Sequence, residues 1–395
     1  MRISLVISSL RRGGAERIMS LLANAWAEQG REVTIVTLDH GVPPAYPIQP
    51  GVRIEGLGLL SESKHLVEGL MKNVRRVQNL RRTIHKSRPD VVISFVDVTN
   101  VLTLLATRRL GIPIIVSERV DPSQHDIGPI WNCLRLFLYR FAETVVCQTP
   151  SIPAWFNRRT RIKWCIIPNP VVVPCALSMS EGGQIKNRSG RVLIAMGRLT
   201  SQKGFDILLE AFSAIAGAHP EWSLTILGDG PLKRRLETQA DFLGLQGRVC
   251  FPGEVSDPLS ALRAADLFVL SSRFEGFPNA LCEAMACGLP AVSFNCPSGP
   301  ADIIRDGIDG ILVAPENVPA LATVLDRLMS DAQERKRLAL RAPEVTTRFS
   351  LESILLLWEK LFEELTRCKG HQIISRNDFP TSSNETESRE KKIAR

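Results

Sequence analysis

The sequence lacks three features, and each absence excludes a class of protein. No apolar run approaches the ~18 residues that a transmembrane helix requires. The nine cysteines form no Cys-x-x-Cys pair and have no histidines at ligand spacing, which argues against a zinc site and for thiols in a reducing cytoplasm. The Gly-x-Gly-x-x-Gly spacing of a dinucleotide-binding turn is also missing. The remaining composition, 44% hydrophobic and 23% charged, is typical of a soluble globular protein.

Apolar runs alternate with helical patterns along most of the 395 residues. This alternation predicts an α/β protein with two doubly wound parallel-sheet domains, each large enough to bury its own core. We expect a first domain over 1–173, a polar linker over 174–190 and a second domain over 191–345. An amphipathic helix is predicted over 350–367, and the polar residues 370–395 are predicted to be a disordered tail.

The most informative stretch is Glu275-Gly-Phe-Pro-Asn-Ala-Leu-Cys-Glu283, in which two glutamates flank the predicted start of a helix at Asn279. The first helical peptides, about Asn279 to Leu281, would present free N–H groups and the positive end of the helix dipole, which attract phosphate. Glu283 would then accept hydrogen bonds from a ribose, and Glu275 from a second sugar. The stretch predicts a nucleotide-sugar site, although two glutamates at this spacing also occur by chance on solvated helix faces.

A second stretch carries two cations on one loop. Arg191–Met196 is predicted to be a strand, and a helical pattern begins after Gly204. Arg198 and Lys203 lie on the connection between them, and neither is expected to have an internal ion-pair partner. Two such cations suit a diphosphate. The alternative is an ordinary pair of solvated surface charges.

The N-terminal end has a comparable strand-to-helix turn. Arg2–Ile7 is predicted to be a strand, and Gly13-Gly-Ala-Glu-Arg17 a glycine turn that opens an amphipathic helix. Because Gly13 and Gly14 have no Cβ, backbone N–H groups there can approach a ligand closely.

These motifs resemble those of retaining glycosyltransferases with the GT-B fold, in the large family marked by two glutamates separated by seven residues. That family includes bacterial enzymes of lipid-linked oligosaccharide synthesis and of capsular or exopolysaccharide synthesis. The resemblance covers roughly residues 1–366. It implies two Rossmann-like domains that face a cleft, with the acceptor on the first and the donor on the second. It also implies that the helix over 350–367 crosses back to the first domain.

The resemblance further implies a UDP-sugar donor and no cofactor. It gives catalytic roles to Arg198, Lys203 and Glu275. The cations and the helix N-terminus would stabilise the leaving diphosphate, so that no metal is required. The residues that it assigns to donor binding are Gly13, Gly14, Phe277, Asn279, Ala280, Leu281 and Glu283.

The acceptor region departs from the commonest pattern of the family. Many relatives carry a histidine just after the strand that here ends at Ser117, whereas this chain has Glu118 and Arg119, with His125 a few residues later. This variant resembles the subgroup that elongates polyprenyl-diphosphate oligosaccharides, which makes these three residues candidates for contacts with a sugar or an acceptor phosphate. The alternatives are a buried salt bridge at the strand end and an ordinary loop histidine.

Positive charge is concentrated in the first half of the chain. Residues 1–170 hold 23 Lys and Arg against 13 Asp and Glu, and eight of these cations lie from Lys64 to Arg88 on a predicted helix with an apolar stripe. A basic amphipathic helix indicates contact with an anionic lipid surface, although a surface helix packed on a sheet is the ordinary alternative. We therefore expect a cytoplasmic enzyme bound peripherally to the inner membrane face. Its expected acceptor is a glycan or is linked to polyprenyl diphosphate.

Two other functions stay open. The base of the donor cannot be identified from the sequence, so a GDP-mannose-dependent mannosyltransferase is the alternative within the same enzyme class. A nucleic-acid-binding protein is suggested by the pI of 9.1 alone. Because the chain has no nucleic-acid motif and no aromatic residues placed to stack on bases, no nucleic-acid partner is expected.

Overall fold

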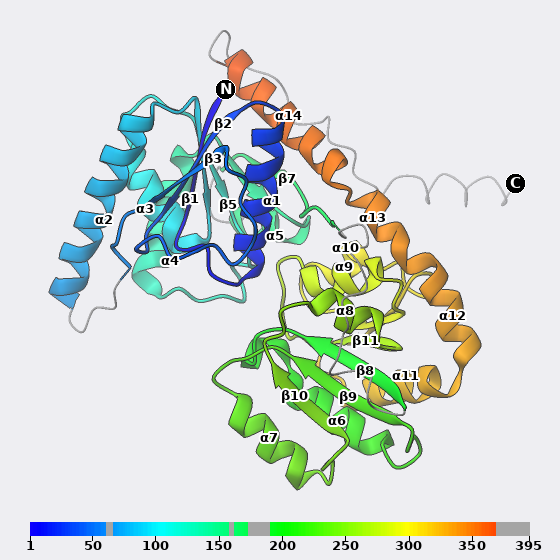
Figure 1. Cartoon of the computed structure of the whole chain (residues 1–395). Coiled ribbons are helices and arrows are strands. Elements are labelled where there is room, and N and C mark those ends of the chain that lie inside the picture. Colours follow the sequence, from blue (N-terminus) through cyan, green and yellow to red (C-terminus); the bar gives the residue numbers. More distant parts are fainter. Residues whose placement is uncertain (61–65, 158–161, 173–189, 369–395) are drawn as a thin grey trace, which may run out of the picture. The chain divides into compact units, whose positions relative to one another are not determined.

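Two parallel β-sheets organise the computed structural model (Figure 1). It describes residues 1–60, 66–157, 162–172 and 190–368. The predicted linker over 174–190, apart from Gly190, and the predicted tail over 370–395 lie outside the described residues. The chain divides into a unit of Met1–Trp358, which holds both sheets, and a second unit from Glu359, of which the end of helix α14 is described.

The first sheet has seven strands in the order β3-β2-β1-β4-β5-β6-β7, and every pair is parallel. Because parallel neighbours cannot be joined by a tight turn, helices make most of the connections. The strands are β1 (Arg2–Ile7), β2 (Glu32–Thr37), β3 (Val52–Gly56), β4 (Val91–Phe95), β5 (Ile114–Ser117), β6 (Thr144–Cys147) and β7 (Trp164–Ile166). The helices are α1 (Gly14–Glu28), α2 (Leu66–Ser87), α3 (Asp97–Thr107), α4 (Pro129–Leu138), η1 (Tyr139–Phe141) and α5 (Ser151–Asn157).

The second sheet has six parallel strands in the order β10-β9-β8-β11-β12-β13. The strands are β8 (Arg191–Met196), β9 (Trp222–Leu227), β10 (Val249–Gly253), β11 (Leu267–Leu270), β12 (Ala291–Phe294) and β13 (Ile311–Val313). The helices between them are η2 (Ser201–Lys203), α6 (Phe205–Ile215), α7 (Lys233–Phe242), α8 (Pro258–Arg263), α9 (Asn279–Ala286) and α10 (Pro300–Ile303). Those that follow are α11 (Val318–Ser330), α12 (Ala332–Arg341), η3 (Ala342–Glu344), α13 (Val345–Arg348) and α14 (Leu351–Cys368). Two doubly wound parallel sheets confirm the predicted α/β fold class.

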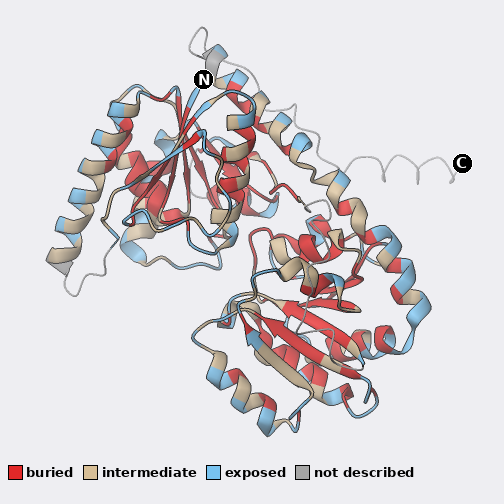
Figure 2. Cartoon of the chain, viewed as in Figure 1, coloured by how far each residue is buried: buried red, intermediate tan, exposed pale blue. Residues whose placement is uncertain are grey.

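The strands form the centre of each core. The residues of inner strands such as β4 and β8 are almost continuously apolar and buried, because helices cover both faces of such sheets (Figure 2). The edge strands β3 and β10 are less buried. Phe212, Trp222 and Phe268 are fully buried around the second sheet. Burying one such side chain stabilises the folded state by about 1.5–3 kcal/mol.

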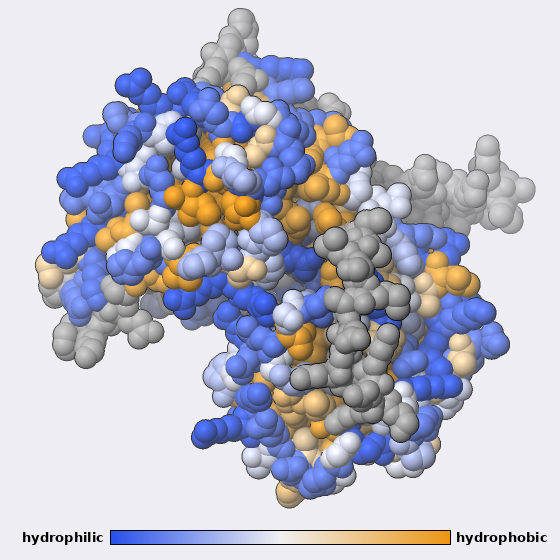
Figure 3. All heavy atoms as spheres, viewed as in Figure 1, coloured by the Kyte–Doolittle hydropathy of each residue, from blue (hydrophilic) through white to orange (hydrophobic). Residues whose placement is uncertain are grey.

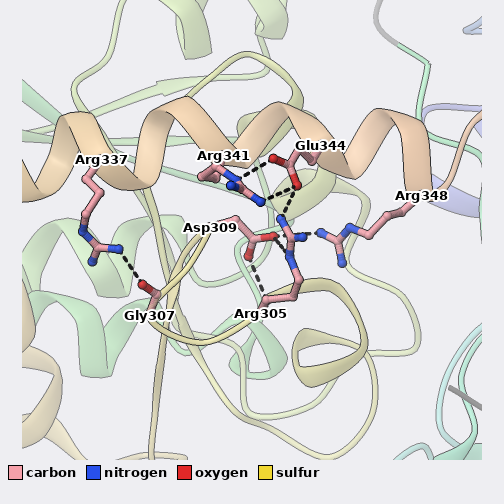
Figure 4. A network of polar contacts seen from close by, with 7 residues as sticks. All are labelled: Arg305, Gly307, Asp309, Arg337, Arg341, Glu344 and Arg348. Carbon is pink, nitrogen blue, oxygen red and sulfur yellow. Dashed lines mark hydrogen bonds and ion pairs between the residues drawn. The ribbon is translucent and has the colours of Figure 1, made fainter. Parts of the chain in front are cut away.

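A cluster of charged residues joins the turn before β13 to the helices α12 to α13 (Figure 4). Asp309 is fully buried and lies 2.7 Å from Arg305 and 3.1 Å from Arg348. Arg305 also pairs with Glu344 at 2.7 Å. These contacts hold the chain that leads to Phe349, whose ring packs edge-on against Phe277 at 5.3 Å, in the loop before α9. The cluster therefore fixes the chain segment that packs against the loop before α9.

Replacing Asp309 with alanine is expected to lower the free energy of unfolding by about 3 kcal/mol, because two arginines lose their shared buried partner. Denaturant unfolding measures this loss. The matched control is Glu344→Ala, which removes a partly exposed partner of Arg305 and should cost much less. Equal losses in the two variants would contradict the role given to Asp309.

Candidate functional site

The candidate residues gather at the carboxyl ends of strands. In each sheet the strand order reverses beside the first strand, since β1 lies between β2 and β4, and β8 lies between β9 and β11. Doubly wound sheets bind ligands at such switch points, outside the carboxyl ends of the strands. The loops after β1, β8 and β11 carry Gly13, Gly14, Arg198, Lys203 and Glu275. The topology thus brings sequence-predicted residues to the two switch points.

Helix α9 begins at Asn279, as the sequence predicts, and Pro278 before it supplies no side-chain cap. The Leu281 N–H donates to the Pro278 carbonyl at 3.1 Å, so the prediction of a free N–H at Leu281 is wrong. Within the described part of the chain, the N–H groups of Asn279 and Ala280 have no acceptor. These two groups keep the positive end of the helix open to an anion.

Glu275 and Lys203 form an ion pair. The Lys203 Nζ lies 2.6 Å from Oε1 of Glu275, and the two side chains are 18% and 6% exposed. The Ser272 hydroxyl donates to the same oxygen at 2.6 Å. The prediction that Lys203 has no internal partner is therefore wrong, because the loop after β11 folds back onto the loop after β8.

Arg198 differs from Lys203, because it is exposed and has no ion pair or side-chain hydrogen bond with any described residue. Its charge acts on Glu16 of α1, where burial raises the pKa of the carboxyl and Arg198 partly lowers it. Gly204 ends this loop with φ at +60°, and a Cβ there would collide with the Ser271 carbonyl oxygen. Glycine thus allows the loops after β8 and β11 to touch.

Glu283 lies one turn into α9 and pairs with Arg17 of α1. Burial raises the pKa of Glu283, and Arg17 opposes that rise. Arg17 belongs to the glycine-turn motif, but no pattern along the chain predicts a contact with a residue 266 positions away.

The glycine turn itself lies against α9. A Cβ on Gly14 would sit 3.0 Å from Nδ2 of Asn279, and a Cβ on Gly13 would collide with the Glu16 carboxylate. Phe277 has a different place, because it is 7% exposed and its ring belongs to the core. The aromatic side chain of Phe277 is therefore packed inside the protein, and its predicted part in donor binding stays a prediction.

A row of polar contacts fixes the start of α9. Arg119 donates through Nη1 to Oδ1 of Asn169 at 2.6 Å, and Asn169 donates through Nδ2 to Oδ1 of Asn279 at 2.9 Å. The Arg119 guanidinium lies over the Phe95 ring, 3.5 Å from its centre, and burial lowers the pKa of Arg119 to about 9. Arg119 therefore connects the end of β5 to the first residue of α9.

Glu118 is buried in the first sheet. It accepts a hydrogen bond from the Tyr139 hydroxyl, and Nη1 of Arg135 lies 3.8 Å from its carboxylate. Burial raises its pKa to about 7, against the opposing effect of Arg135. Of the two alternatives open for Glu118, the structure shows a buried ion pair, with Arg135 as the partner.

His125 has a partner that the sequence did not indicate. Its Nε2 lies 3.3 Å from Oδ2 of Asp97, the first residue of α3. Burial by itself would raise the pKa of Asp97, but hydrogen bonds from His125 and the Val98 N–H outweigh it and lower that pKa. Val96, just before Asp97, has φ at +73°, which is rare for a β-branched residue and marks local strain at the first switch point.

Replacing Asp97 with asparagine is expected to lower the pKa of His125, because the hydrogen bond to the carboxylate raises it. NMR titration of the His125 ring measures this change. Since the pKa is raised in the folded protein, the pair stabilises the fold at low pH, and this contribution is lost as pH rises through the folded-state pKa. An unchanged ring pKa in the variant would show that the contact does not form.

Two family models match the chain in succession. Residues 13–170 match a glycosyl transferase 4-like domain, and residues 182–345 match the glycosyl transferases group 1. Both models describe glycosyltransferase domains, and together they cover most of the chain. The protein is a glycosyltransferase. The predicted enzyme class is therefore confirmed.

This glycosyltransferase has curated relatives along most of its length. It is 28% identical over 92% of its chain to the "GalNAc-alpha-(1->4)-GalNAc-alpha-(1->3)-diNAcBac-PP-undecaprenol alpha-1,4-N-acetyl-D-galactosaminyltransferase" of Campylobacter jejuni, of which it covers 99%. It is 29% identical over 87% of its chain to the lipopolysaccharide core biosynthesis glycosyltransferase LpsE of Rhizobium meliloti, of which it covers 93%.

Among solved structures, this glycosyltransferase resembles Anabaena HepE in complex with UDP, with a TM-score of 0.73 and 19% identity. The match covers 92% of this chain and 100% of HepE. At this identity the likeness shows the fold, and the GT-B architecture is confirmed.

Proposed function

We propose that the protein is a retaining glycosyltransferase that moves a hexose or N-acetylhexosamine from a UDP-sugar to a lipid-linked or surface-polysaccharide acceptor. One observation carries this proposal. The open first turn of α9 lies between Glu275 and Glu283, and the loop with Arg198 and Lys203 contacts the segment before α9 through the Lys203–Glu275 pair. An anion site between two acceptors of hydroxyl hydrogen bonds suits a sugar, a diphosphate and a ribose in a row.

The relatives support the acceptor and donor classes. The Campylobacter jejuni enzyme is named for a polyprenyl-diphosphate-linked oligosaccharide, the Rhizobium meliloti enzyme for lipopolysaccharide core synthesis, and HepE was solved with UDP. We carry these classes to this chain as part of the proposal.

In this mechanism the leaving diphosphate gains negative charge as the glycosidic bond breaks. Arg198, Lys203 and the N–H groups of Asn279 and Ala280 stabilise that charge, so no metal is required. The leaving phosphate takes the proton of the attacking acceptor hydroxyl, which approaches from the same face and retains the anomeric configuration. Glu275 orients the donor sugar.

The acceptor binds at the first switch point in this account. The loop after β5 carries His125, whose charged form is favoured by Asp97 and suits an acceptor phosphate. Glu118 and Arg119 lie at the start of this loop and hold it in place. Glu118 is hydrogen-bonded to Tyr139, and Arg119 to Asn169.

The membrane contact rests on exposed apolar residues beside basic ones. Helix α2 exposes Leu70, Met71 and Val74, and in Figure 3 hydrophobic residues lie among hydrophilic ones along it. Helix α4 and η1 expose Phe137 and Phe141. None of the helices in the described residues combines the length and hydrophobicity that a membrane span needs. We propose that these surfaces bind the inner face of the membrane from the cytoplasm, and cosedimentation with anionic but not zwitterionic vesicles tests this.

A donor panel tests the proposed reaction. Nucleotide release is measured from UDP-sugars and from GDP-mannose, with and without EDTA. The proposal predicts release of UDP that EDTA does not abolish. Release from GDP-mannose alone would replace the proposal with a mannosyltransferase, and release from no donor would contradict both.

A further inference from the structure

The ion pair between Arg17 and Glu283 joins elements of the two sheets. Arg17 lies on α1, which follows β1, and Glu283 lies on α9, which follows β11. Their side chains are 21% and 12% exposed, so water solvates neither charge well. Each of these charges needs a partner in every state of the site, because an unpaired buried charge is costly.

The position of Arg17 places its guanidinium beside the proposed phosphate site. The preceding Gly14 lies against the Asn279 side chain, at the open turn of α9. Arg17, Asn279 and Glu283 line one small cavity together with Cys282. The Arg17 side chain therefore pairs with the proposed ribose acceptor Glu283 and lines a cavity with Asn279, the first residue of α9.

A second ion pair repeats this arrangement at the other end of the proposed donor site. Lys203 pairs with Glu275, which is proposed to accept hydroxyls of the donor sugar. Each carboxylate that is proposed to bind a sugar ring is thus held by a cation near the proposed diphosphate position. A donor supplies hydroxyls for the carboxylates and phosphate oxygens for the cations at the same time.

We propose that Arg17 is a donor-binding residue that exchanges its partner Glu283 for the donor diphosphate when the ribose hydroxyls bind Glu283. This inference rests on the proposed function. The guanidinium suits the exchange because it forms bidentate hydrogen bonds to carboxylate and phosphate alike. A nucleoside displaces Arg17 from Glu283 without offering it phosphate oxygens, whereas a nucleoside diphosphate offers both. The exchange therefore selects for the diphosphate.

Isothermal titration of uridine and UDP tests the exchange in the full-length wild type and in Arg17→Met. In Arg17→Met the affinity for UDP is expected to fall about tenfold or more, because a charged partner of the diphosphate is lost. The affinity for uridine should stay the same or rise, since Glu283 no longer has to be released. The dissociation constant of uridine divided by that of UDP therefore falls. A purely structural role of Arg17 would not lower this ratio.

Two further variants control for folding. Arg11→Met removes a nearby exposed arginine that has no ion pair with the described residues, and it should leave both affinities unchanged. The double variant Arg17→Met/Glu283→Gln leaves no unpaired buried charge, so it should fold and still have weakened UDP binding. Equal weakening of uridine and UDP in Arg17→Met, or unchanged UDP binding, would overturn the exchange alone. Absence of UDP and GDP binding to the wild type would overturn the proposed function and the exchange together.

Discussion

Replacing Arg198 with alanine is expected to lower kcat about a hundredfold or more, roughly 3 kcal/mol in the barrier, without shifting the melting temperature. The loss in rate follows because Arg198 is proposed to stabilise the charge of the leaving diphosphate. The melting temperature should not change, because Arg198 is exposed and has no ion pair with the described residues. Steady-state kinetics and thermal unfolding on one preparation measure both effects.

The matched variant is Lys203→Met. It should also lower kcat, but it leaves Glu275 without its cation in a largely buried place, so it should lower the melting temperature as well. Both substitutions on this loop should therefore lower kcat, but only Lys203→Met should also lower the melting temperature. Unchanged kcat in Arg198→Ala would contradict a role in stabilising the leaving group.

Replacing Glu275 with glutamine is expected to lower kcat/KM roughly a hundredfold, because the charged acceptor that orients the donor sugar becomes a neutral one. The amide keeps the size of the side chain and can still accept the Ser272 hydroxyl. Lys203 loses its ionic partner, so the stability falls too. Initial rates at several donor concentrations measure the loss.

The double variant Lys203→Met/Glu275→Gln separates the two effects. Because it removes both charges of the pair, it should be more stable than Glu275→Gln alone, while its kcat/KM should stay low. Activity that returned together with stability would mean that the pair is structural and that Glu275 does not act on the donor.

Local sequence patterns predicted most of the strands and helices. The strand Arg191–Met196 and the helix start at Asn279 were predicted at the residues where they occur, because apolar runs and proline or glycine boundaries determine such elements. The fold class followed from the alternation of strands and helices. The glutamates and the cations of the candidate site lie on loops that follow strands, so topology alone brings them to the switch points.

The pairings within the site were not predictable in this way. Lys203 and Glu275 are 72 residues apart, and Arg17 and Glu283 are 266 residues apart, so each contact depends on how separate loops meet. The partner of His125 was missed for the same reason, since Asp97 follows a different strand. Glu118 shows a further limit, because a strand-end glutamate has the same local sequence whether it faces a ligand or a buried arginine.

Thermal unfolding of the wild type and of Glu283→Ala in the presence of UDP-sugars and GDP-mannose tests the central claim most directly. A ligand at about a hundred times its dissociation constant adds about 2.7 kcal/mol to the stability of the folded state. We predict that UDP-sugars raise the melting temperature of the wild type and that Glu283→Ala loses this shift. A wild type that no nucleotide sugar stabilises would contradict the donor site.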